Sequence, residues 1–261
     1  MLTVLPHESR QAWLLRRLRE RYEHPEEVRA YSKQVKQGLT PEEIVLLNSL
    51  LPGSCRIANL GCGAGREALA LVEKGHRVVA LDISRAMLRG ARQLARESRL
   101  ELACVWMSDP LRLPLPHRAF DRVLALAQLL SHIPGTEARV ALLSEVRRVL
   151  VPGGMFIASV TDRAAAADLC FGDEDPGDQL SPLERAAGWE EGDIWVWQPS
   201  EARLDTPLFF HLHTREEIIS ELEAAGLRLV AYVGGHELTP AAASDAYRYR
   251  FVVARRENQR R

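Results

Sequence analysis

The chain has 261 residues, 46% of them hydrophobic, and its 34 lysines and arginines nearly balance its 35 acidic residues. A chain of this size can bury one large core, its near-neutral charge opposes binding to nucleic acid or an anionic membrane surface, and no apolar run approaches the ~20 residues of a membrane-spanning helix. The four cysteines show no CxxC or Cys/His ligand spacing, so we expect a soluble, cytoplasmic protein with reduced thiols, no bound metal and a small-molecule partner, as a monomer or a homodimer.

The segment before residue 52 is predicted to be helical. Leu14, Leu18 and Tyr22 recur at helical spacing among arginines, which is typical of an amphipathic helix that lies on another surface. The arginines then form a solvated face, with phosphate or RNA binding as the alternative. A second helix over about 41–51 is indicated by a capping box and a proline at the first helical position, in Thr40, Pro41 and Glu43. We assign residues 1–51 to an N-terminal helical cap.

Strands and helices alternate after this cap. Apolar runs at about 56–60, 77–82, 100–106, 120–126 and 155–160 are separated by helical stretches at about 64–75, 84–98 and 136–150. This alternation predicts right-handed crossovers in a parallel sheet. Near the C-terminus, a capping box at Thr214 and Glu217 begins a helix that ends at Gly226. The last two strands, in "RLVAYVG" and "YRYRFVVARR", leave no room for a crossover helix and should pair as an antiparallel hairpin.

The predicted fold class is therefore α/β, with a doubly wound, seven-stranded mixed sheet. Residues 52–160 form its core, and residues 211–261 complete it with a helix and a strand hairpin. Between them, residues 161–210 carry glycines, prolines and acidic residues, followed by an aromatic group. Long connections in compact domains are often functional lids, and an unfolded segment gains nothing by exposing tryptophans. We assign residues 161–210 to an inserted lid.

A glycine-rich loop follows the first strand. The stretch "NLGCGAGREALALVEKGHRVVALDIS" contains Gly61, Gly63 and Gly65, which would bring backbone N–H groups and a helix N-terminus against a ligand. The nicotinamide fingerprint requires glycine or alanine where this sequence has Arg66, and no GK[ST] follows, which excludes a P-loop. Asp82, at the end of the next strand, suits two vicinal ribose hydroxyls. The predicted ligand has a ribose and no pyrophosphate.

These residues resemble the first two motifs of class I S-adenosylmethionine-dependent methyltransferases. The resemblance continues through "SDPLRLPLPHRAFDRVLAL", "LLSEVRRVLVPGGMF" and "FHLHTREEIISELEAAGLRLV", and covers roughly residues 50 to 235. The chain is similar to the small-molecule-type branch of that superfamily. The resemblance implies a Rossmann-like, seven-stranded sheet with an antiparallel last strand, S-adenosylmethionine as cofactor and S-adenosylhomocysteine as its product.

The resemblance also implies roles for individual residues. The methionine moiety would lie against Gly61, Cys62, Gly63 and Gly65, and the ribose would lie against Asp82. The adenine would contact Ile83, Met87, Ser108 and Asp109. The sulfonium and the methionine carboxylate would lie beside Ala127 and Gln128. Structural roles stay open for three of them. Cys62 would then be a packing residue, Asp82 a neighbour of the helix capped by Ser84, and Asp109 part of a turn.

Asn59 departs from the family pattern. Members usually carry a carboxylate at this position, just before the first motif glycines, and here it is an amide. The amide oxygen can still bridge the loop and bind the cofactor's amino group, but it lacks the charge that attracts an ammonium. The departure favours, as an alternative, a protein that binds the cofactor with weak or no turnover.

Two residues are candidates for chemistry at the acceptor. His132 follows the fourth strand, where the resemblance places residues that face the methyl group. It is a candidate general base or acceptor-positioning residue, with a hydrogen-bonded structural histidine as the alternative. Tyr31 lies in the helical cap, which often closes over the acceptor in similar enzymes.

The acceptor itself is expected to contact the lid. Trp195 and Trp197 alternate in "DIWVWQ", so they share one side if this segment is extended, and we predict that at least one contacts the acceptor. Packing of the insertion onto the sheet is the alternative. His211 and His213 alternate in "FFHLHT", which places His211 at the substrate mouth; a metal pair here lacks a third ligand.

The predicted function is S-adenosylmethionine-dependent methylation of an oxygen, nitrogen or carbon atom of a small acceptor. An RNA-modifying methyltransferase remains an alternative because of the arginine-rich first helix, but the neutral net charge and the acidic residues between 162 and 184 oppose it.

Overall fold

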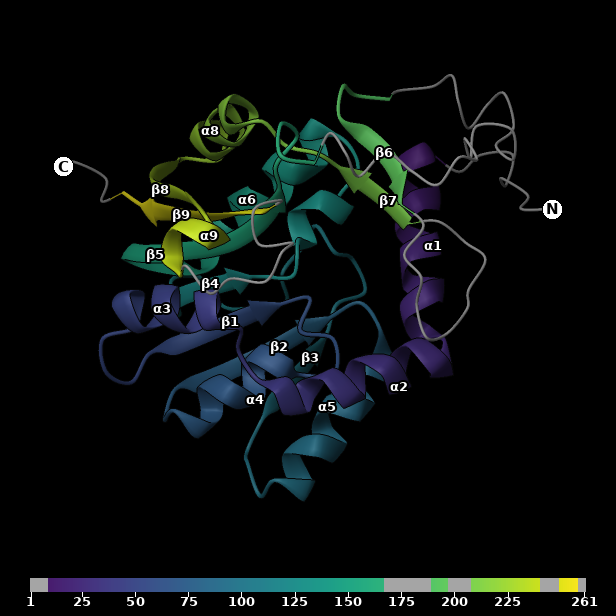
Figure 1. Ribbon diagram of the computed structural model, residues 1–261, viewed down its shortest axis with the longest axis vertical. Coiled ribbons are helices and arrows are strands. Elements are labelled where there is room, and N and C mark those ends of the chain that lie inside the picture. The colour runs from purple at the N-terminus through teal and green to yellow at the C-terminus, as the bar shows by residue number, and fades with distance from the viewer. Residues whose placement is uncertain (1–8, 167–188, 197–207, 240–248, 258–261) are drawn as a thin grey trace.

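The computed structural model describes residues 9–166, 189–196, 208–239 and 249–257. Its main sheet has seven strands in the order β3-β2-β1-β4-β5-β9-β8 (Figure 1). They are β1 (Arg56–Leu60), β2 (Arg77–Asp82), β3 (Ala103–Trp106), β4 (Phe120–Ala125), β5 (Leu150–Thr161), β8 (Leu227–Gly234) and β9 (Tyr249–Arg256). Strands β1 to β5 pair in parallel, and β9 is antiparallel to both β5 and β8. This confirms the predicted mixed α/β sheet with an antiparallel last strand.

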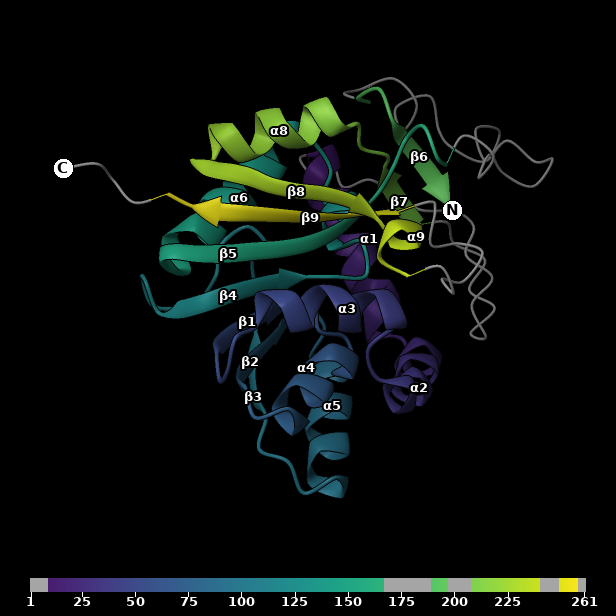
Figure 2. The ribbon, with the colours of Figure 1, turned by 60° about the vertical axis from the view of Figure 1, so that its left-hand side comes forward.

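Helices cover both faces of the sheet (Figure 2). One face carries α3 (Pro41–Leu50), α4 (Arg66–Glu73) and α5 (Arg85–Glu97), and the other carries α6 (Thr136–Val149) and α8 (Arg215–Ala224). In β1, Ile57 packs beneath the first group, whereas Ala58 and Leu60 pack beneath the second. Successive strand residues point to opposite faces, so a fully apolar strand serves two cores.

The predicted element boundaries hold except at two strands. Both capping boxes are confirmed, at the starts of α3 and α8. Strand β3 begins later than the apolar run that starts at residue 100, because the N–H of Leu100 still donates to Ala95 O at 2.8 Å and closes the end of α5. Strand β5 begins earlier than predicted, because Leu150 already pairs with Phe120 before the register shifts.

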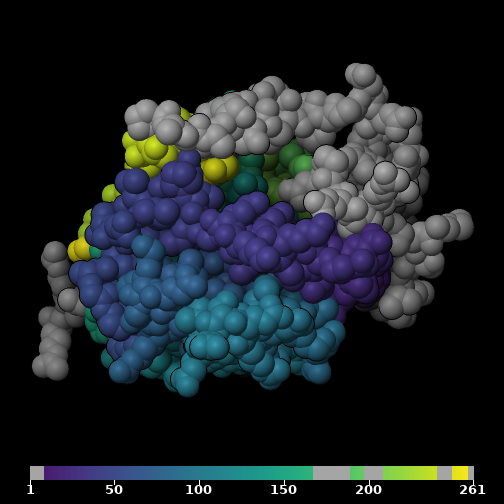
Figure 3. All heavy atoms as spheres, turned by 60° about the horizontal axis from the view of Figure 1, so that its bottom comes forward, coloured from purple at the N-terminus to yellow at the C-terminus, as the bar shows by residue number. Residues whose placement is uncertain are grey.

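The N-terminal residues fold into α1 (Arg10–Glu23), α2 (Pro25–Gln34) and the 3-10 helix η1 (Val35–Gln37) before α3. They form a continuous purple band across one face of the molecule (Figure 3). Trp13, Leu14 and Leu18 bury the apolar side of α1, as its periodicity predicts. A buried ion pair between Arg21 and Glu27, 3.0 Å apart, joins α1 to α2.

A separate two-stranded sheet lies beside α1 (Figure 1). Its strands β6 (Asp193–Val196) and β7 (Leu208–His211) pair antiparallel. The predicted boundary between residues 210 and 211 therefore falls inside β7. Trp195 packs with Trp13, Trp189 and Phe209, a group that we call the aromatic cluster. Trp197 lies outside the described residues.

The N-terminal helices are hydrogen-bonded to the start of α5. The hydroxyl of Ser84 donates to Tyr22 O at 2.8 Å, and the carboxylate of Glu23 accepts from the N–H groups of Arg85 and Ala86. The remaining elements are the 3-10 helix η2 (Leu129–His132) and the short helix α9 (Gly235–Leu238). No helix in the described part of the chain combines the length and apolar character that crossing a membrane requires.

Candidate functional site

The glycine loop connects β1 to α4 at the carboxyl edge of the sheet. Gly61, Gly63 and Gly65 all have positive φ angles, of 61°, 53° and 97°. A β-carbon on Gly61 would lie only 2.8 Å from Leu129 Cδ1, and one on Gly65 would lie 3.2 Å from Ala91 Cβ. The positive φ angles therefore favour glycine at all three positions, and the close approach of α5 adds to this preference at Gly65. The loop leads into the N-terminus of α4, which favours an anionic group.

Asp82 ends β2 directly beside this loop and is only 6% exposed. Its Oδ2 accepts a hydrogen bond from Gly63 N at 2.8 Å, and its Oδ1 accepts one from Ser84 N at 2.8 Å. Burial raises the pKa of Asp82 to about 6, although these N–H groups oppose the shift. Asp82 thus supports both the loop and the start of α5. Each carboxylate oxygen keeps a second lone pair for a ligand hydroxyl.

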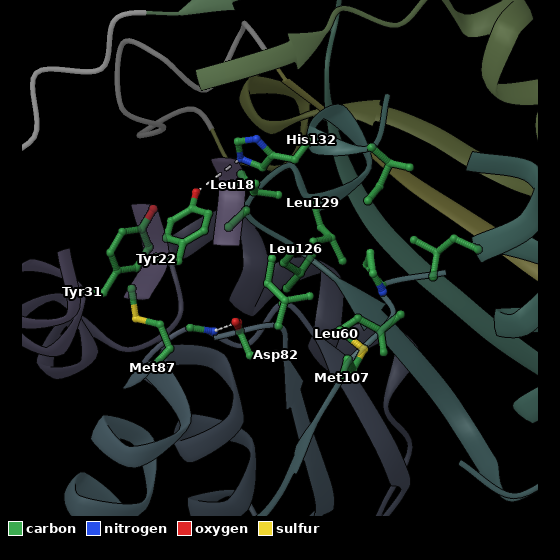
Figure 4. Close-up of a pocket in the computed structure, with 17 residues that line it drawn as sticks. Leu18, Tyr22, Tyr31, Leu60, Asp82, Met87, Met107, Leu126, Leu129 and His132 are labelled. Atoms are coloured by element: carbon green, nitrogen blue, oxygen red, sulfur yellow. Dashed lines mark hydrogen bonds between the residues drawn. The ribbon is translucent and has the colours of Figure 1, made fainter. Parts of the chain in front are cut away.

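These residues open into a cavity of about 740 Å³ (Figure 4). Of the predicted cofactor-binding residues, the cavity brings together Gly61, Gly63, Asp82, Ile83, Met87 and Ala127. The rest of its lining is mostly apolar and includes Leu18, Leu60, Met107, Leu129 and Leu142.

A second cavity of about 760 Å³ shares six lining residues with the first, among them Gly61, Gly63 and Tyr31. It adds more polar residues: Gln34, Cys62, Arg66, Glu67 and Gln128. Burial raises the pKa of the Cys62 thiol well above its usual value, so this side chain stays a protonated packing group rather than a nucleophile. Because the linings overlap, the two cavities form one site with an apolar and a polar end.

The backbone after β4 is held in an unusual conformation at this site. Ala127 and Gln128 have φ angles of 51° and 62°, the left-handed region that residues other than glycine rarely adopt. The Gln128 side chain accepts a hydrogen bond from Thr161 Oγ1 at 3.0 Å, and its backbone N–H donates to Ser159 Oγ at 3.0 Å. These contacts with β5 hold the turn, and such strained turns cluster at functional sites.

His132 lies between the sheet and the N-terminal helices. Its Nδ1 is 3.2 Å from Phe209 O, and its Nε2 is 3.5 Å from the hydroxyl of Tyr22 (Figure 4). A carbonyl oxygen only accepts, so in the neutral ring Nδ1 carries the proton and Nε2 is an acceptor. Burial lowers the pKa of His132 to about 4, which keeps the ring neutral at pH 7.

Two tyrosines from the N-terminal helices meet His132 at the cavity. Tyr22 and Tyr31 pack edge to face with ring centroids 5.7 Å apart, and both line the two cavities. Burial raises the pKa of both hydroxyls, so they stay protonated. The sequence assigned Tyr31 to the site but treated Tyr22 only as part of a buried helix face. Its helical spacing from Leu18, which also lines the cavity, was the available signal.

Four predicted cofactor residues lie outside the lining of both cavities. Gly65 caps α4 behind the loop, and Asn59 is buried with no hydrogen-bond partner on its Oδ1. Ser108 and Asp109 are exposed and sit between the lining residues Met107 and Pro110. Asp109 Oδ1 accepts from Leu111 N at 2.9 Å, which is the turn geometry left open as an alternative. The contact of Ser108 and Asp109 with an adenine stays a prediction.

Two of the predicted acceptor contacts, Trp195 and His211, line neither cavity. Trp195 is 6% exposed, belongs to the aromatic cluster and lines neither cavity. This position favours the packing role that was its alternative. His211 is 1% exposed and its Nδ1 lies 2.7 Å from Asp193 Oδ1, so it too is away from both linings.

Glu190, Asp193 and His211 offer ligand atoms that all lie within 4.8 Å of one another. The sequence had left His211 without acidic neighbours for a metal. Both carboxylates already pair with arginines, however: Asp193 with Arg10 at 3.2 Å, and Glu190 with Arg139 at 2.8 Å. A cation would have to displace these guanidinium groups, so the geometry is that of an ion-pair network that holds β6 in place.

The site has the features that a nucleoside with an amino-acid substituent requires. Asp82 offers carboxylate lone pairs for vicinal hydroxyls, an apolar slot opens beside Ile83 and Met87, and the glycine loop leads to the polar end with Arg66 and Glu67.

Residues 57–154 match the family model described as a methyltransferase domain. Among curated proteins, the demethylmenaquinone methyltransferase of Symbiobacterium thermophilum is 33% identical over 137 residues, which cover 50% of this chain and 51% of that protein. The carboxy-S-adenosyl-L-methionine synthase of Pseudomonas putida is 34% identical over 164 residues, which cover 60% of this chain and 61% of that protein. The chain thus spans about half the length of the curated relatives it matches.

A solved structure extends the likeness to nearly the whole fold. The S-adenosylmethionine-dependent methyltransferase from Methanosarcina mazei superposes with a TM-score of 0.64 at 21% identity, over 85% of this chain and 100% of that chain. Residues 57–154 therefore match a methyltransferase domain, and the chain has the fold of a solved S-adenosylmethionine-dependent methyltransferase.

Proposed function

We propose that this protein is a cytoplasmic, S-adenosylmethionine-dependent methyltransferase that methylates an acidic hydroxyl, such as a phenol or an enol, on a small apolar acceptor. The observation that carries the proposal is one cavity with Asp82 and the glycine loop on one side and the Nε2 acceptor of His132 on the other. The match to a methyltransferase domain supports the cofactor class, and the His132 side supports the choice of acceptor.

The cofactor would occupy the Asp82 side. When bound, it supplies a methyl group on a sulfonium, which is already an activated leaving group. Asp82 would accept hydrogen bonds from the ribose hydroxyls through its remaining lone pairs, and Ile83 and Met87 would pack on the adenine. Ala127, at the strained turn after β4, lines both cavities and would position the donor at their junction.

The acceptor would lie between this junction and the N-terminal helices. Leu18 and Leu129 offer apolar surface, and Tyr22 and Tyr31 exclude water from the reacting atoms. As the C–O bond forms and the C–S bond breaks, the hydroxyl proton would pass to Nε2 of His132, which the carbonyl of Phe209 keeps in the correct tautomer.

The low basicity of His132 narrows the acceptor class. Its pKa of about 4 makes it a weak base, because the buried ring is poorly solvated when charged. It would take a proton from a phenol or an enol more readily than from an aliphatic alcohol. This argument supports an acidic hydroxyl over an aliphatic one, and the presence of a candidate base supports a hydroxyl over a neutral amine, which needs no base.

The cofactor assignment is tested by thermal unfolding in the presence of three ligands. S-adenosylmethionine and S-adenosylhomocysteine should each stabilise the protein by about 2.7 kcal/mol at 100 times Kd, and NAD should not. Equal stabilisation by NAD would overturn the assignment.

The acceptor assignment is tested with His132→Gln and a panel of phenols, aliphatic alcohols and amines. Removing a general base lowers kcat by about 10²–10⁴-fold, and the variant should keep its affinity for S-adenosylhomocysteine. His213→Gln is the matched control, because His213 is also buried but lines neither cavity. Turnover of amines but not phenols would overturn the O-methylation proposal, and cofactor binding with no turnover of any acceptor would favour a cofactor-binding protein.

A further inference from the structure

The polar end of the site contains an acidic group that the proposed chemistry does not use. Glu67 lies in the first turn of α4, is 7% exposed at its side chain and lines the second cavity together with Gly61 and Gly63. Apart from Asp82, it is the only acidic residue that lines either cavity in the described part of the chain. It lies beside the loop where the resemblance places the methionine moiety, whereas Asp82 would face the ribose.

Glu67 is held in place by an ion-pair network. Nη2 of Arg66 lies 2.5 Å from Glu67 Oε1, and the same guanidinium donates to both oxygens of Glu43 at 2.7 and 2.8 Å and to Gly38 O at 2.9 Å. One arginine therefore faces two carboxylates and cannot neutralise both of them when they are ionised. Burial raises the pKa of Glu67, while Arg66 opposes the shift. A cationic ligand group would offset that cost.

Asn59 cannot provide this charge. It occupies the position where the superfamily usually has a carboxylate, yet it is a neutral amide, is 1% exposed and lines neither cavity. Its Oδ1 is buried without a partner. The loop thus lacks an acidic group at its usual position, and the nearest one that reaches the cavity is eight positions along the chain, at Glu67.

We propose that Glu67, positioned by Arg66 and Glu43, binds the ammonium of the cofactor's aminoacyl group and so replaces the charge that Asn59 lacks. The inference rests on the proposed cofactor. It makes Glu67 a determinant of specificity for the aminoacyl end, separate from Asp82 at the ribose. A carboxylate that meets an ammonium forms a charge-assisted hydrogen bond, which is stronger than one between neutral groups.

The test compares three ligands by calorimetry on the whole chain. S-adenosylhomocysteine carries the ammonium, its desamino analogue lacks only that group, and methylthioadenosine lacks the whole aminoacyl end. Glu67→Gln keeps the shape of the side chain and a contact to Arg66. It should weaken S-adenosylhomocysteine by about tenfold or more, and change the Kd of the other two ligands by less than about twofold.

Glu221→Gln is the matched control, since Glu221 is also a buried carboxylate paired with an arginine, 2.7 Å from Arg139 and outside both linings. It should leave all three affinities unchanged. Methylthioadenosine binding also reports whether the Glu67 variant is folded. Equal weakening of all three ligands, or no weakening of S-adenosylhomocysteine, would overturn the role of Glu67. Failure of the unmodified protein to bind any of the three would instead overturn the proposed function, and this inference with it.

Discussion

The floor of the cavity, formed by the glycine loop and Asp82, differs from its cover, formed by α1, α2 and the β6–β7 hairpin, in how each is held. In the floor, Asp82 accepts from Gly63 and Ser84, which are 19 and 2 positions away. In the cover, Arg10 pairs with Asp193 across 183 positions, and Trp13 packs on Trp195. The floor is built from short-range backbone hydrogen bonds, and the cover from long-range side-chain packing.

This difference assigns separate tasks to the two regions. In the floor, the Asp82 carboxylate is fixed by backbone N–H groups, so its position changes little when neighbouring side chains are substituted. A cover made of side chains can change its lining without disturbing the sheet. Substitutions in the floor should therefore alter cofactor affinity, and substitutions in the cover should alter stability and acceptor selection.

The largest expected effect is in the cover. Trp195→Ala removes a buried indole that packs edge to face on Trp13 and Phe209, which typically costs about 3–5 kcal/mol. The hairpin should lose its attachment to α1, and Tm should fall by several degrees while the Kd for S-adenosylhomocysteine stays unchanged. Thermal unfolding and calorimetry on the same sample measure both quantities.

Trp106→Ala sharpens this comparison from the other side. Trp106 lies in β3, and its indole N–H donates to Ile83 O at 3.0 Å, next to the predicted adenine slot. The substitution Trp106→Ala should therefore weaken cofactor binding and also lower the stability of the fold. If Trp195→Ala instead weakened acceptor binding without lowering Tm, Trp195 would be an acceptor contact and the division between floor and cover would fail.

A smaller effect is expected at Asp82. Asp82→Ala should cost about 1.5–3 kcal/mol of affinity for S-adenosylhomocysteine and for methylthioadenosine alike, since it removes charge-assisted contacts to the ribose that both ligands have. Asp109→Ala, an exposed carboxylate after β3, should cost less than Asp82→Ala. Calorimetry that found the two substitutions equivalent, or Asp82→Ala without effect, would return Asp82 to a purely structural role at the loop.

The smallest expected effect is on pH dependence. Ribose hydroxyls donate to the ionised carboxylate of Asp82, whose pKa in the free protein is about 6 through burial and the nearby charge of Glu23. Binding therefore favours the deprotonated form, so affinity should be constant above pH 7 and fall by about tenfold between pH 7 and pH 5. Methylthioadenosine is the suitable ligand because it lacks the ammonium proposed to meet Glu67. Asp82→Asn should remove this dependence, and a pH-independent Kd in the unmodified protein would contradict the assignment.

The sheet and the glycine loop could be predicted from the sequence because their signals are local. Alternating apolar runs, capping boxes at Thr40 and Thr214 and glycines that need positive φ each depend on neighbouring residues. The antiparallel end of the sheet followed from the short connection between its last two strands. These constraints act within one or two elements, so one sequence is enough to recognise them.

The cover could be predicted only in part, because its contacts join residues far apart in the chain. Tyr22 and His132 are 110 positions apart, and nothing in the periodicity of α1 indicates that this tyrosine reaches a histidine after β4. Trp195 lies in an extended segment, the condition on which its prediction depended, but which surface that segment meets depends on where α1 lies. The acidic partners of His211 were missed for the same reason, since β6 and β7 meet only in the folded chain.

The carbonyl of Phe209 that sets the proton on His132 belongs to β7, the strand that also packs the cover onto α1. The next residue of β7, Phe210, lines the second cavity. Under the proposed mechanism, a change in β7 would therefore alter both the cavity wall and the tautomer of His132. Diversification of such a protein would then proceed by jumps that alter reactivity and selectivity at once, rather than by gradual changes in the shape of the pocket.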